Sequence, residues 1–495
     1  MLSSGVLSQW LAPWFLQRVA TEIIWWMLLD VASTSRWDWP PNSQCRRLPG
    51  LVPSDRNPPI GDTHSIAGNM TAVLDIDGDG ACTATLIQTQ QSPKRVFRDA
   101  KQQTARLLKR LQRARERNDE KTASFLQQTL LKSTSAKLVA ADEAGRRLRR
   151  SGKCAAEGIE LQRLAKCLSA TSAPEEKVVV RPKWKDASNF RAIYQFGQAN
   201  LARQILVRMA LKPFAKFDQR QFMSGGGREA ACRHILSLMP THRWVVKADI
   251  KTFYLTVDRD WLRQSLPIGK EITSSTVLLE NQTNISYQGW GLHSPYASDI
   301  SLSHAARSGL PQGASSSPIV AEMIGAEIMS QIPLGIEIVN YADDFLVLGR
   351  TRAEAEKALQ TLCSAVKRCP AGSFVLKVGK VRRSADGIDF LGYNLRSGRY
   401  WTDAKPLKKT LDRFVRRIPR IITNMQQHKP ADKRCLMRYV SGWRASNQLW
   451  TSRDHWIFQQ LRPWAMAFPE LSREILAPWI KHIPIILSCL GVNDT

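Results

Sequence analysis

The fold of this chain depends on the stretch Ile336-Glu-Ile-Val-Asn-Tyr-Ala-Asp-Asp-Phe-Leu-Val-Leu-Gly349. Two apolar runs flank a polar tip that carries Tyr341 and the adjacent carboxylates Asp343 and Asp344. This pattern predicts a tight β-hairpin with acids at its turn. Neighbouring carboxylates repel, so a fold that keeps both beside an apolar sheet usually neutralises them with a cation, and hard oxygen ligands favour Mg²⁺. For this stretch alone, an exposed Asp-Asp turn without a metal is the alternative.

The composition indicates a folded protein with a polyanionic partner. The chain has 495 residues, enough for two to four domains, and 43% of them are hydrophobic. Lys and Arg number 71 against 43 Asp and Glu, which gives a formal net charge of +28. So large a bias points to nucleic acid, with an anionic membrane surface as the alternative.

Cysteine usage and the first residues bear on the compartment. The nine cysteines include no Cys-x-x-Cys pair, which argues against a zinc ribbon and a disulfide scaffold and favours a reducing cytoplasm. Residues 10–31 are apolar and rich in tryptophan, but Arg18, Glu22 and Asp30 interrupt them. We therefore expect an amphipathic packing helix there and no membrane span.

Residues 93–150 have the pattern of a basic helical hairpin. The apolar residues Val96, Leu107, Leu108, Leu111, Phe125, Leu126, Leu130 and Leu131 recur at helical spacing and form its expected core. Asn118-Asp119 marks the break between the two helices. The expected exposed face carries Arg106, Lys109, Arg110, Arg113, Arg115 and Arg117. This face is either a nucleic-acid contact or an ordinary solvated surface.

A second hairpin is expected over residues 178–185 and 189–194. Both runs have the pattern of strands, and a polar turn joins them. Lys183, Lys185 and Arg191 lie on these strands and could hold a triphosphate. As structure alone, the three side chains would be surface charges.

Asp249 ends an apolar run that begins at Trp244 and predicts a buried strand. Asp249 and the Asp343-Asp344 pair lie far apart in the sequence, so only long-range strand pairing can bring them together. If the strands pair, three carboxylates converge at one edge of a sheet. This is the ligand set that two-metal phosphoryl transfer requires.

Between these acids lies the loop Gly309-Leu-Pro-Gln-Gly-Ala-Ser-Ser-Ser-Pro318, followed by an apolar helix. Ser317 as N-cap and Pro318 at the first helical position would start that helix. Gly313 allows the backbone to approach a ligand closely, and Gln312 would project from the loop. With the acids on either side, the loop is a candidate platform for an incoming nucleotide and a template base.

The order of these segments resembles the reverse transcriptase family. Asp249 matches the A-type motif, residues 310–318 the B-type motif and Tyr341-Ala-Asp-Asp344 the C-type motif. Residues 374–380 resemble the D-type segment, and Phe390-Leu-Gly-Tyr393 the primer-grip region. The resemblance spans about residues 175–395. It implies an α+β right-hand polymerase fold, with fingers, a palm built on an antiparallel sheet, and a helical thumb.

The resemblance also implies roles for single residues. Asp249 and Asp343 would be the principal ligands of two Mg²⁺ ions, or of Mn²⁺, with Asp344 beside them and the carbonyl of Ile250 assisting. Tyr254 falls on the steric-gate position, where an aromatic ring excludes a ribose 2′-hydroxyl. The remaining nucleotide-binding candidates are Lys183 or Lys185, Arg191, Gln312 and Lys380. Lys380 could protonate the departing pyrophosphate, and Lys377 is its neighbour.

The upstream residues Arg95–Lys101 and Phe125–Ala140 are similar to the N-terminal extension of bacterial group II intron reverse transcriptases, which contacts RNA in that family. The insertion at 266–304 and the absence of an Arg-Pro-Leu-Gly pattern at 189–196 depart from that clade. The expected domains are an N-terminal region of unknown role at 1–92, a basic helical extension at 93–174, fingers and palm at 175–398, and a helical, maturase-like thumb at 399–495.

The sequence thus predicts a cytoplasmic, Mg²⁺-dependent RNA-directed DNA polymerase. Its expected partners are an RNA template, a DNA product duplex and deoxynucleoside triphosphates, with a dedicated structured RNA as a further candidate and no membrane. Two alternatives remain open. One is an RNA-binding maturase or scaffold that keeps the polymerase fold, and the other is an enzyme of antiviral defence whose synthesis is untemplated or depends on an RNA partner.

Overall fold

The structure is a computed structural model, and it describes residues 70–76, 82–88, 93–185, 189–288, 299–427 and 434–468. The chain divides into two units, residues 1–89 and 90–495. In the first unit, β1 (Met70–Ile76) and β2 (Cys82–Gln88) form an antiparallel hairpin. The helix expected at 10–31 lies outside the described residues. Within the described part of the chain, no helix is both long enough and apolar enough to span a bilayer.

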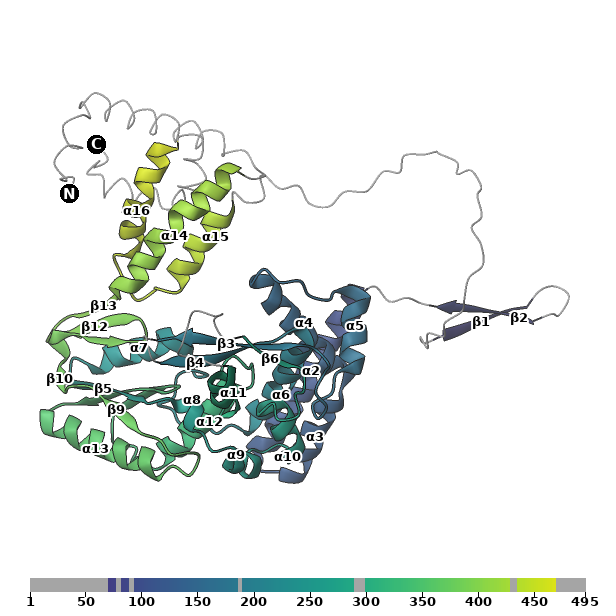
Figure 1. Ribbon diagram of the computed structural model, residues 1–495, viewed down its shortest axis with the longest axis horizontal. Helices are drawn as coiled ribbons and strands as arrows, with labels where there is room; N and C mark the ends of the chain where they lie inside the picture. Colours follow the sequence, from purple (N-terminus) through teal and green to yellow (C-terminus); the bar gives the residue numbers. More distant parts are fainter. Residues whose placement is uncertain are drawn as a thin grey trace. The chain divides into compact units, whose positions relative to one another are not determined.

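The second unit is built on a central antiparallel sheet with β5 (Trp244–Ile250) in its interior (Figure 1). On one side β5 pairs with β8 (Asp344–Gly349), which continues to β7 (Ile338–Tyr341). On the other side β5 pairs with β9 (Leu376–Val378) and β10 (Arg382–Arg383). The predicted hairpin of β7 and β8 and the predicted strand before Asp249 are therefore both confirmed.

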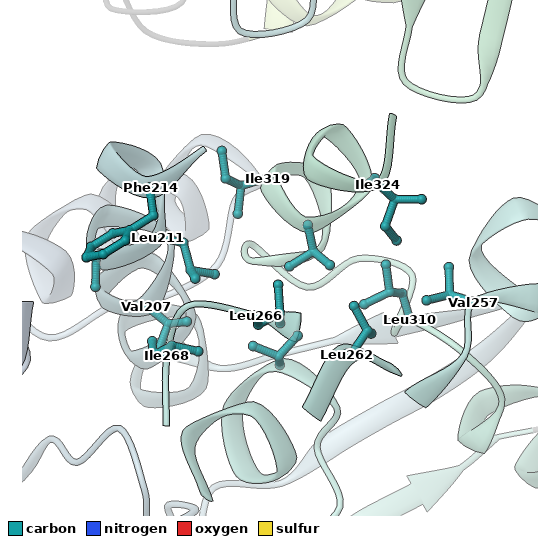
Figure 2. Packing of buried hydrophobic residues seen from close by; sticks show 14 of the residues in the cluster. Val207, Leu211, Phe214, Val257, Leu262, Leu266, Ile268, Leu310, Ile319 and Ile324 are labelled. Atoms are coloured by element: carbon teal, nitrogen blue, oxygen red, sulfur yellow. The ribbon is translucent and has the colours of Figure 1, made fainter. Parts of the chain in front are cut away.

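The strands β5, β7 and β8 of the central sheet are buried on both faces because they are apolar at most positions. Val246 and Val347 belong to a core cluster that includes residues of α12 (Ser317–Ser330) and α13 (Arg352–Arg368). Their neighbour Val245 faces the opposite side of the sheet and belongs to a separate cluster with residues of the small C-terminal sheet, among them Phe390 and Leu395. Figure 2 shows part of the first cluster, in which Leu310 packs in the same group as Val257 and Leu262.

A separate three-stranded sheet has the strand order β4-β3-β6, and its buried apolar side chains form a separate hydrophobic cluster. β3 (Val178–Trp184) and β4 (Phe190–Gln195) form the antiparallel hairpin that the sequence predicts. The insertion at 266–304 supplies the third strand, β6 (Ile285–Tyr287), which runs parallel to β3. Its last residues begin α11 (Asp299–Arg307).

Four N-terminal helices are part of the main core. They are α2 (Pro93–Glu116), α3 (Glu120–Lys132), α4 (Thr134–Arg150) and α5 (Gly158–Cys167). Their buried side chains share one cluster with α6 (Gln198–Leu211) and with the central sheet. The predicted pair of helices with a break at Asn118-Asp119 is therefore present as α2 and α3, and it packs as part of the main core.

Two details of the predicted hairpin are wrong. Phe125 is 67% exposed, because the buried face of α3 is formed by Ala123, Leu126 and Leu130. Arg115 does not lie on the free basic face. Its guanidinium group sits over the ring of Phe214, 4.7 Å from the centroid, and pairs with Glu120.

The C-terminal part contains a small antiparallel sheet and three helices. The strands are β11 (Ile388–Phe390), β12 (Tyr393–Ser397) and β13 (Thr402–Pro406). The helices α14 (Lys408–Gln427), α15 (Arg434–Ala445) and α16 (Arg453–Ala467) share an apolar cluster of their own.

The shorter helices elsewhere are η1 (Lys212–Phe214), α7 (Gly227–Leu238), α8 (Phe253–Thr256), α9 (Arg259–Ser265), α10 (Lys270–Ile272), η2 (Thr273–Val277) and η3 (Ser384–Asp386).

Adjacent positions on α3 test this packing directly. Leu126 is 3% exposed, so Leu126→Ala should lower the free energy of unfolding by roughly 2–4 kcal/mol, because it removes buried methyl groups and leaves a cavity. Phe125→Ala removes a largely solvated ring and should change the free energy of unfolding by less than about 0.5 kcal/mol. Urea unfolding followed by circular dichroism measures both variants. Equal losses would contradict the packing of α3.

Candidate active site

Strand pairing places the three predicted carboxylates at one edge of the central sheet. Asp249 on β5 lies directly opposite Asp344 on β8. Tyr341 pairs with Asp344, which leaves Ala342 and Asp343 as a two-residue turn. The backbone N–H of Ile250 donates to the carbonyl of Asp343 at 3.1 Å, so the turn is fastened to the end of β5. Asp344 itself belongs to the strand and not to the turn.

The turn has a demanding backbone. Ala342 has φ +56°, in the left-handed region that glycine adopts more easily. The buried side chain of Asn340 donates from Nδ2 to the carbonyl of Ala342 at 2.9 Å. This hydrogen bond stabilises the turn and thereby fixes the position of Asp343.

The surroundings of Asp249 and Asp343 disfavour the ionised form of their carboxyl groups. Burial, and then the charge of Asp344, raises the pKa of Asp343 above its ordinary value, although Arg191 and Lys247 act in the opposite direction. Burial also raises the pKa of Asp249, with further contributions from Asp343 and Asp344. The edge of the sheet therefore holds excess negative charge that a bound cation would stabilise.

Lys247 is a functional candidate that the sequence analysis missed. Its Nζ lies 2.8 Å from Oδ1 of Asp344. Lys247 precedes Asp249 by two positions on β5 and so points to the same face of the sheet, which is the only signal that the sequence offered. Lys247 partly neutralises the third acid.

The donor set fits a divalent cation at Asp249 and Asp343. Within the described residues, the side chains as placed form no group of three or more His, Cys, Asp or Glu able to hold a metal ion, and Asp344 is engaged by Lys247. The other two acids are hard oxygen donors, and both have raised pKa values. Their charge and chemistry suit Mg²⁺ or Mn²⁺.

Cations from the β3–β4 hairpin and from β9 face these acids. Lys183 and Arg191 are cross-strand partners, and the charge of Arg191 lowers the pKa of Asp343. The charge of Lys185 likewise acts to lower the pKa of Asp249. On the other side of β5, Lys377 lies directly opposite Asp249, whereas Lys380 follows the end of β9. Of the two lysines, the register favours Lys377 as the one beside the acids.

Tyr254 lies on α8, immediately after the strand that carries Asp249. Burial, and then the charge of Asp343, raises the pKa of Tyr254 to about 12. The backbone N–H of Leu310 donates to the carbonyl of Tyr254 at 2.7 Å. A Cβ at Gly309 would lie 2.0 Å from that carbonyl oxygen, and Gly309 has φ +55°. Only glycine allows this close approach, which joins the loop to the Tyr254 segment.

The same loop is fastened to β4 through Gln312 and Gly313. The backbone N–H of Tyr194 donates to the carbonyl of Gln312 at 2.8 Å. Gly313 has φ +107°, and a Cβ there would meet the carbonyl oxygen of Tyr194 at 2.6 Å. The structure therefore brings the loop with Gln312 together with the strand that carries Arg191.

Hydrogen bonds from the helices α4 and α6 to Ser315 also hold the loop in place. The backbone N–H of Ser315 donates to Oε1 of Gln204 on α6 at 2.8 Å. Its hydroxyl oxygen accepts a hydrogen bond of 2.9 Å from Nη1 of Arg147 on α4. Glu143 bonds both Arg147 and Arg208. Burial raises the pKa of Glu143, but these two arginines more than offset the effect and leave it below its ordinary value.

The predicted helix cap at the end of the loop is wrong by one residue. The N-cap of α12 is Ser316, whose side chain makes no capping hydrogen bond, and the helix begins at Ser317. The hydroxyl of Ser317 donates back to the carbonyl of Pro311 at 2.7 Å. This residue therefore closes the loop on itself and does not cap the helix.

The paired acidic strands, the glycine loop and the antiparallel sheets define a nucleic-acid polymerase fold. Residues 183–395 match the family model described as reverse transcriptase (RNA-dependent DNA polymerase). The predicted resemblance to the reverse transcriptase family, a class of nucleotidyltransferases, is therefore confirmed over this segment.

Other comparisons are more distant. The solved structure of Sicinivirus 3Dpol RNA dependent RNA polymerase is similar, with 10% sequence identity and a TM-score of 0.29. The alignment covers 50% of this chain and 56% of that polymerase, so this chain spans little more than half of the viral protein's length. No curated protein sequence matches the chain.

The charge of Asp343 should limit the stability of the metal-free protein. A carboxyl group whose pKa is raised in the folded state costs stability once pH rises through that pKa, at about 1.4 kcal/mol per pKa unit. Asp343→Asn should therefore raise the thermal unfolding midpoint near pH 7. The gain should disappear below the ordinary pKa of 3.8, where the carboxyl group is protonated in both states.

Differential scanning fluorimetry with and without Mg²⁺ checks this prediction. Mg²⁺ should raise the midpoint of the natural protein more than that of Asp343→Asn, because the variant has lost a ligand. Asp403→Asn, at an exposed acid on β13, is the control and should respond to Mg²⁺ as the natural protein does. An equal response from Asp343→Asn would exclude a cation at Asp343.

Proposed function

We propose that this chain is an RNA-directed DNA polymerase that extends a DNA strand on an RNA template by two-metal-ion phosphoryl transfer. The observation that carries the proposal is the register of β5 and β8. It sets Asp249 opposite Asp344, beside the turn with Asp343, inside the segment that matches the reverse transcriptase family. In this proposal the central sheet is the palm, the β3–β4 hairpin belongs to the fingers, and α14–α16 form the thumb.

The acids of the palm would hold the metal ions. Asp249 and Asp343, with the carbonyl of Ile250, are the proposed ligands, and Asp344 lies beside them against Lys247. When bound, Mg²⁺ or Mn²⁺ would lower the pKa of the primer hydroxyl and stabilise the leaving pyrophosphate. Lys183, Lys185 and Arg191 would bind the triphosphate through charge-assisted hydrogen bonds.

A lysine of the D-type segment would donate the proton to the departing pyrophosphate. Lys380 is the residue that the resemblance selects, and Lys377 is the one whose register places it opposite Asp249. Both side chains are exposed and can reach a ligand over the edge of the sheet. The structure supports Lys377 more strongly.

Nucleotide selection would depend on Tyr254 and the glycine loop. Tyr254 lies against the loop through the Leu310 hydrogen bond, and its ring would exclude a ribose 2′-hydroxyl. Gln312, held beside Tyr194, would contact the nucleotide. Arg147 and Gln204 would keep the loop in place through Ser315, so the N-terminal helices would contribute to nucleotide binding.

The partners proposed are the RNA template, the DNA product duplex and deoxynucleoside triphosphates, in agreement with the net charge of +28. The helices from 93 onward support the kinship to group II intron-like enzymes. A non-catalytic RNA-binding scaffold would have no need of two half-buried carboxylates with raised pKa values, so these acids favour an enzyme.

Removal of either principal acid should abolish synthesis. Asp249→Ala and Asp343→Ala each remove a proposed metal ligand, and the rate of primer extension with deoxynucleotides on an RNA template should fall by about 10³-fold or more. RNA affinity should stay within about twofold, because neither change touches the basic surface. Asp403→Ala is the control and should extend normally. Retained synthesis by Asp343→Ala would overturn the site.

Tyr254 should control the choice of sugar. Tyr254→Ala removes the proposed steric barrier, and the preference for deoxynucleotides over ribonucleotides in kcat/KM should fall by roughly 10- to 100-fold. Tyr254→Phe keeps the ring and should retain the preference. Parallel single-nucleotide extension with both sugars measures the ratio. An unchanged ratio in Tyr254→Ala would remove Tyr254 from the selection of sugar.

A further inference from the structure

The end of the central sheet remote from the acids carries a second concentration of positive charge. Asp249 and Asp344 pair at one end of β5 and β8, whereas Trp244 and Gly349 pair at the other. The next residues beyond that end are Arg243 and Arg350. At about 3.3 Å per residue, β5 separates them from the acids by roughly 20 Å.

Three neighbouring elements continue this surface. Arg382 and Arg383 on β10 pair with Val245 and Trp244 on the edge of β5. The backbone N–H of Ser384 then donates to the carbonyl of Arg243 at 2.8 Å. The hydroxyl of Ser384 donates to the carbonyl of Ser397 at 3.3 Å, which brings the turn between β12 and β13 to the same end of the sheet.

The arginine side chains of this surface are not paired with acids. Arg243, Arg350, Arg382, Arg383 and Arg399 are all exposed, and within the described ranges none of their side chains forms an ion pair. The exposed acids on the adjoining elements are Glu354, Asp386, Asp389 and Asp403, one fewer than these arginines, and Oε2 of Glu354 accepts a hydrogen bond of 2.8 Å from the backbone N–H of Arg350. Arg243 and Arg350 also line a surface hollow of about 520 Å³ with Pro240 and Thr241, and no acid lines it.

Two aromatic rings stand exposed beside these arginines. Tyr400 is 85% exposed and Trp401 51%, at the tip of the β12–β13 turn. The guanidinium group of Arg399 lies over the Tyr400 ring, 5.2 Å from its centroid. The Trp401 indole packs on Gly398, where a Cβ would lie 2.2 Å from Nε1. Such large exposed rings commonly mark a binding surface.

We propose that Arg243, Arg350, Arg382, Arg383, Arg399, Tyr400 and Trp401 form a second nucleic-acid site that binds a single-stranded RNA segment. The arginines would contact phosphates, and the two rings would stack on unpaired bases. A duplex exposes phosphates but buries the faces of its bases, so it would leave the rings unused. The site shares no residue with the proposed polymerase centre and goes beyond its function.

Binding of a fluorescein-labelled oligouridine RNA tests the proposal. A saturating, unlabelled primer–template duplex is present throughout, so that the polymerase centre is occupied. The double variant Tyr400→Ala/Trp401→Ala should weaken oligouridine binding by about tenfold or more, because it removes two stacking rings. Arg243→Ala/Arg350→Ala should weaken it too and reduce the slope of log K against log salt by about 1.4, since each phosphate contact to a single strand contributes about 0.7.

The control is Lys367→Ala/Arg368→Ala, which removes two exposed cations at the other end of α13. It should bind oligouridine as the natural chain does. All variants should keep the natural unfolding midpoint, and their primer extension on a short template should be unchanged. Photo-crosslinking of a bromouridine-substituted RNA should label a peptide that contains Tyr400 or Trp401.

Several results would overturn the site. These are natural affinity in the aromatic double variant, an equal loss in the control, equal affinity for an RNA duplex, or a parallel loss of primer extension. A chain that fails to extend any primer but still binds oligouridine through Tyr400 and Trp401 would refute the proposed function and leave this site standing. The two proposals therefore fail separately.

Discussion

The antiparallel pairing of β5 with β8 is the interaction on which the rest of the structure depends. It joins segments far apart in the sequence and sets Asp249 opposite Asp344. The sheet is buried on both faces, with Val245 and Val246 in different apolar clusters. A slip of one residue would exchange these faces and point Asp249 into the core, so burial of the sheet specifies the register of the acids.

The glycine loop depends on this framework from three directions. Gly309 lies against the Tyr254 carbonyl, Gly313 against Tyr194, and Ser315 between Gln204 and Arg147. The last contact extends the site into α4, whose side chains share the main core with α6. The N-terminal helices are therefore a structural part of the loop's support.

Much of the site could be predicted from local pattern, because strands that end in acids and a glycine loop leave strong signals in sequence. The ion pair of Lys247 with Asp344 and the position of Lys377 opposite Asp249 could not, since both follow from long-range register. Phe125 was predicted to be buried because it is apolar and lies at helical spacing from other apolar residues. The spacing alone does not show which side of the helix packs against its neighbours, and Phe125 is in fact exposed. The insertion at 266–304 was unreadable because its short strand β6 is stabilised only by pairing with β3.

The charge balance at the edge of the sheet explains why so many cations surround it. Three carboxylates lie there, and Lys247 forms an ion pair with one of them, Asp344. Burial raises the pKa values of Asp249 and Asp343, so their charge is costly without a counter-ion. Arg191 and Lys185 offset part of that cost at a distance, but in the proposed function they are needed by an incoming triphosphate. Once a nucleotide engages those side chains, a cation held directly by the two acids would replace the charge that they no longer supply. Metal binding and nucleotide binding at this edge should therefore be coupled.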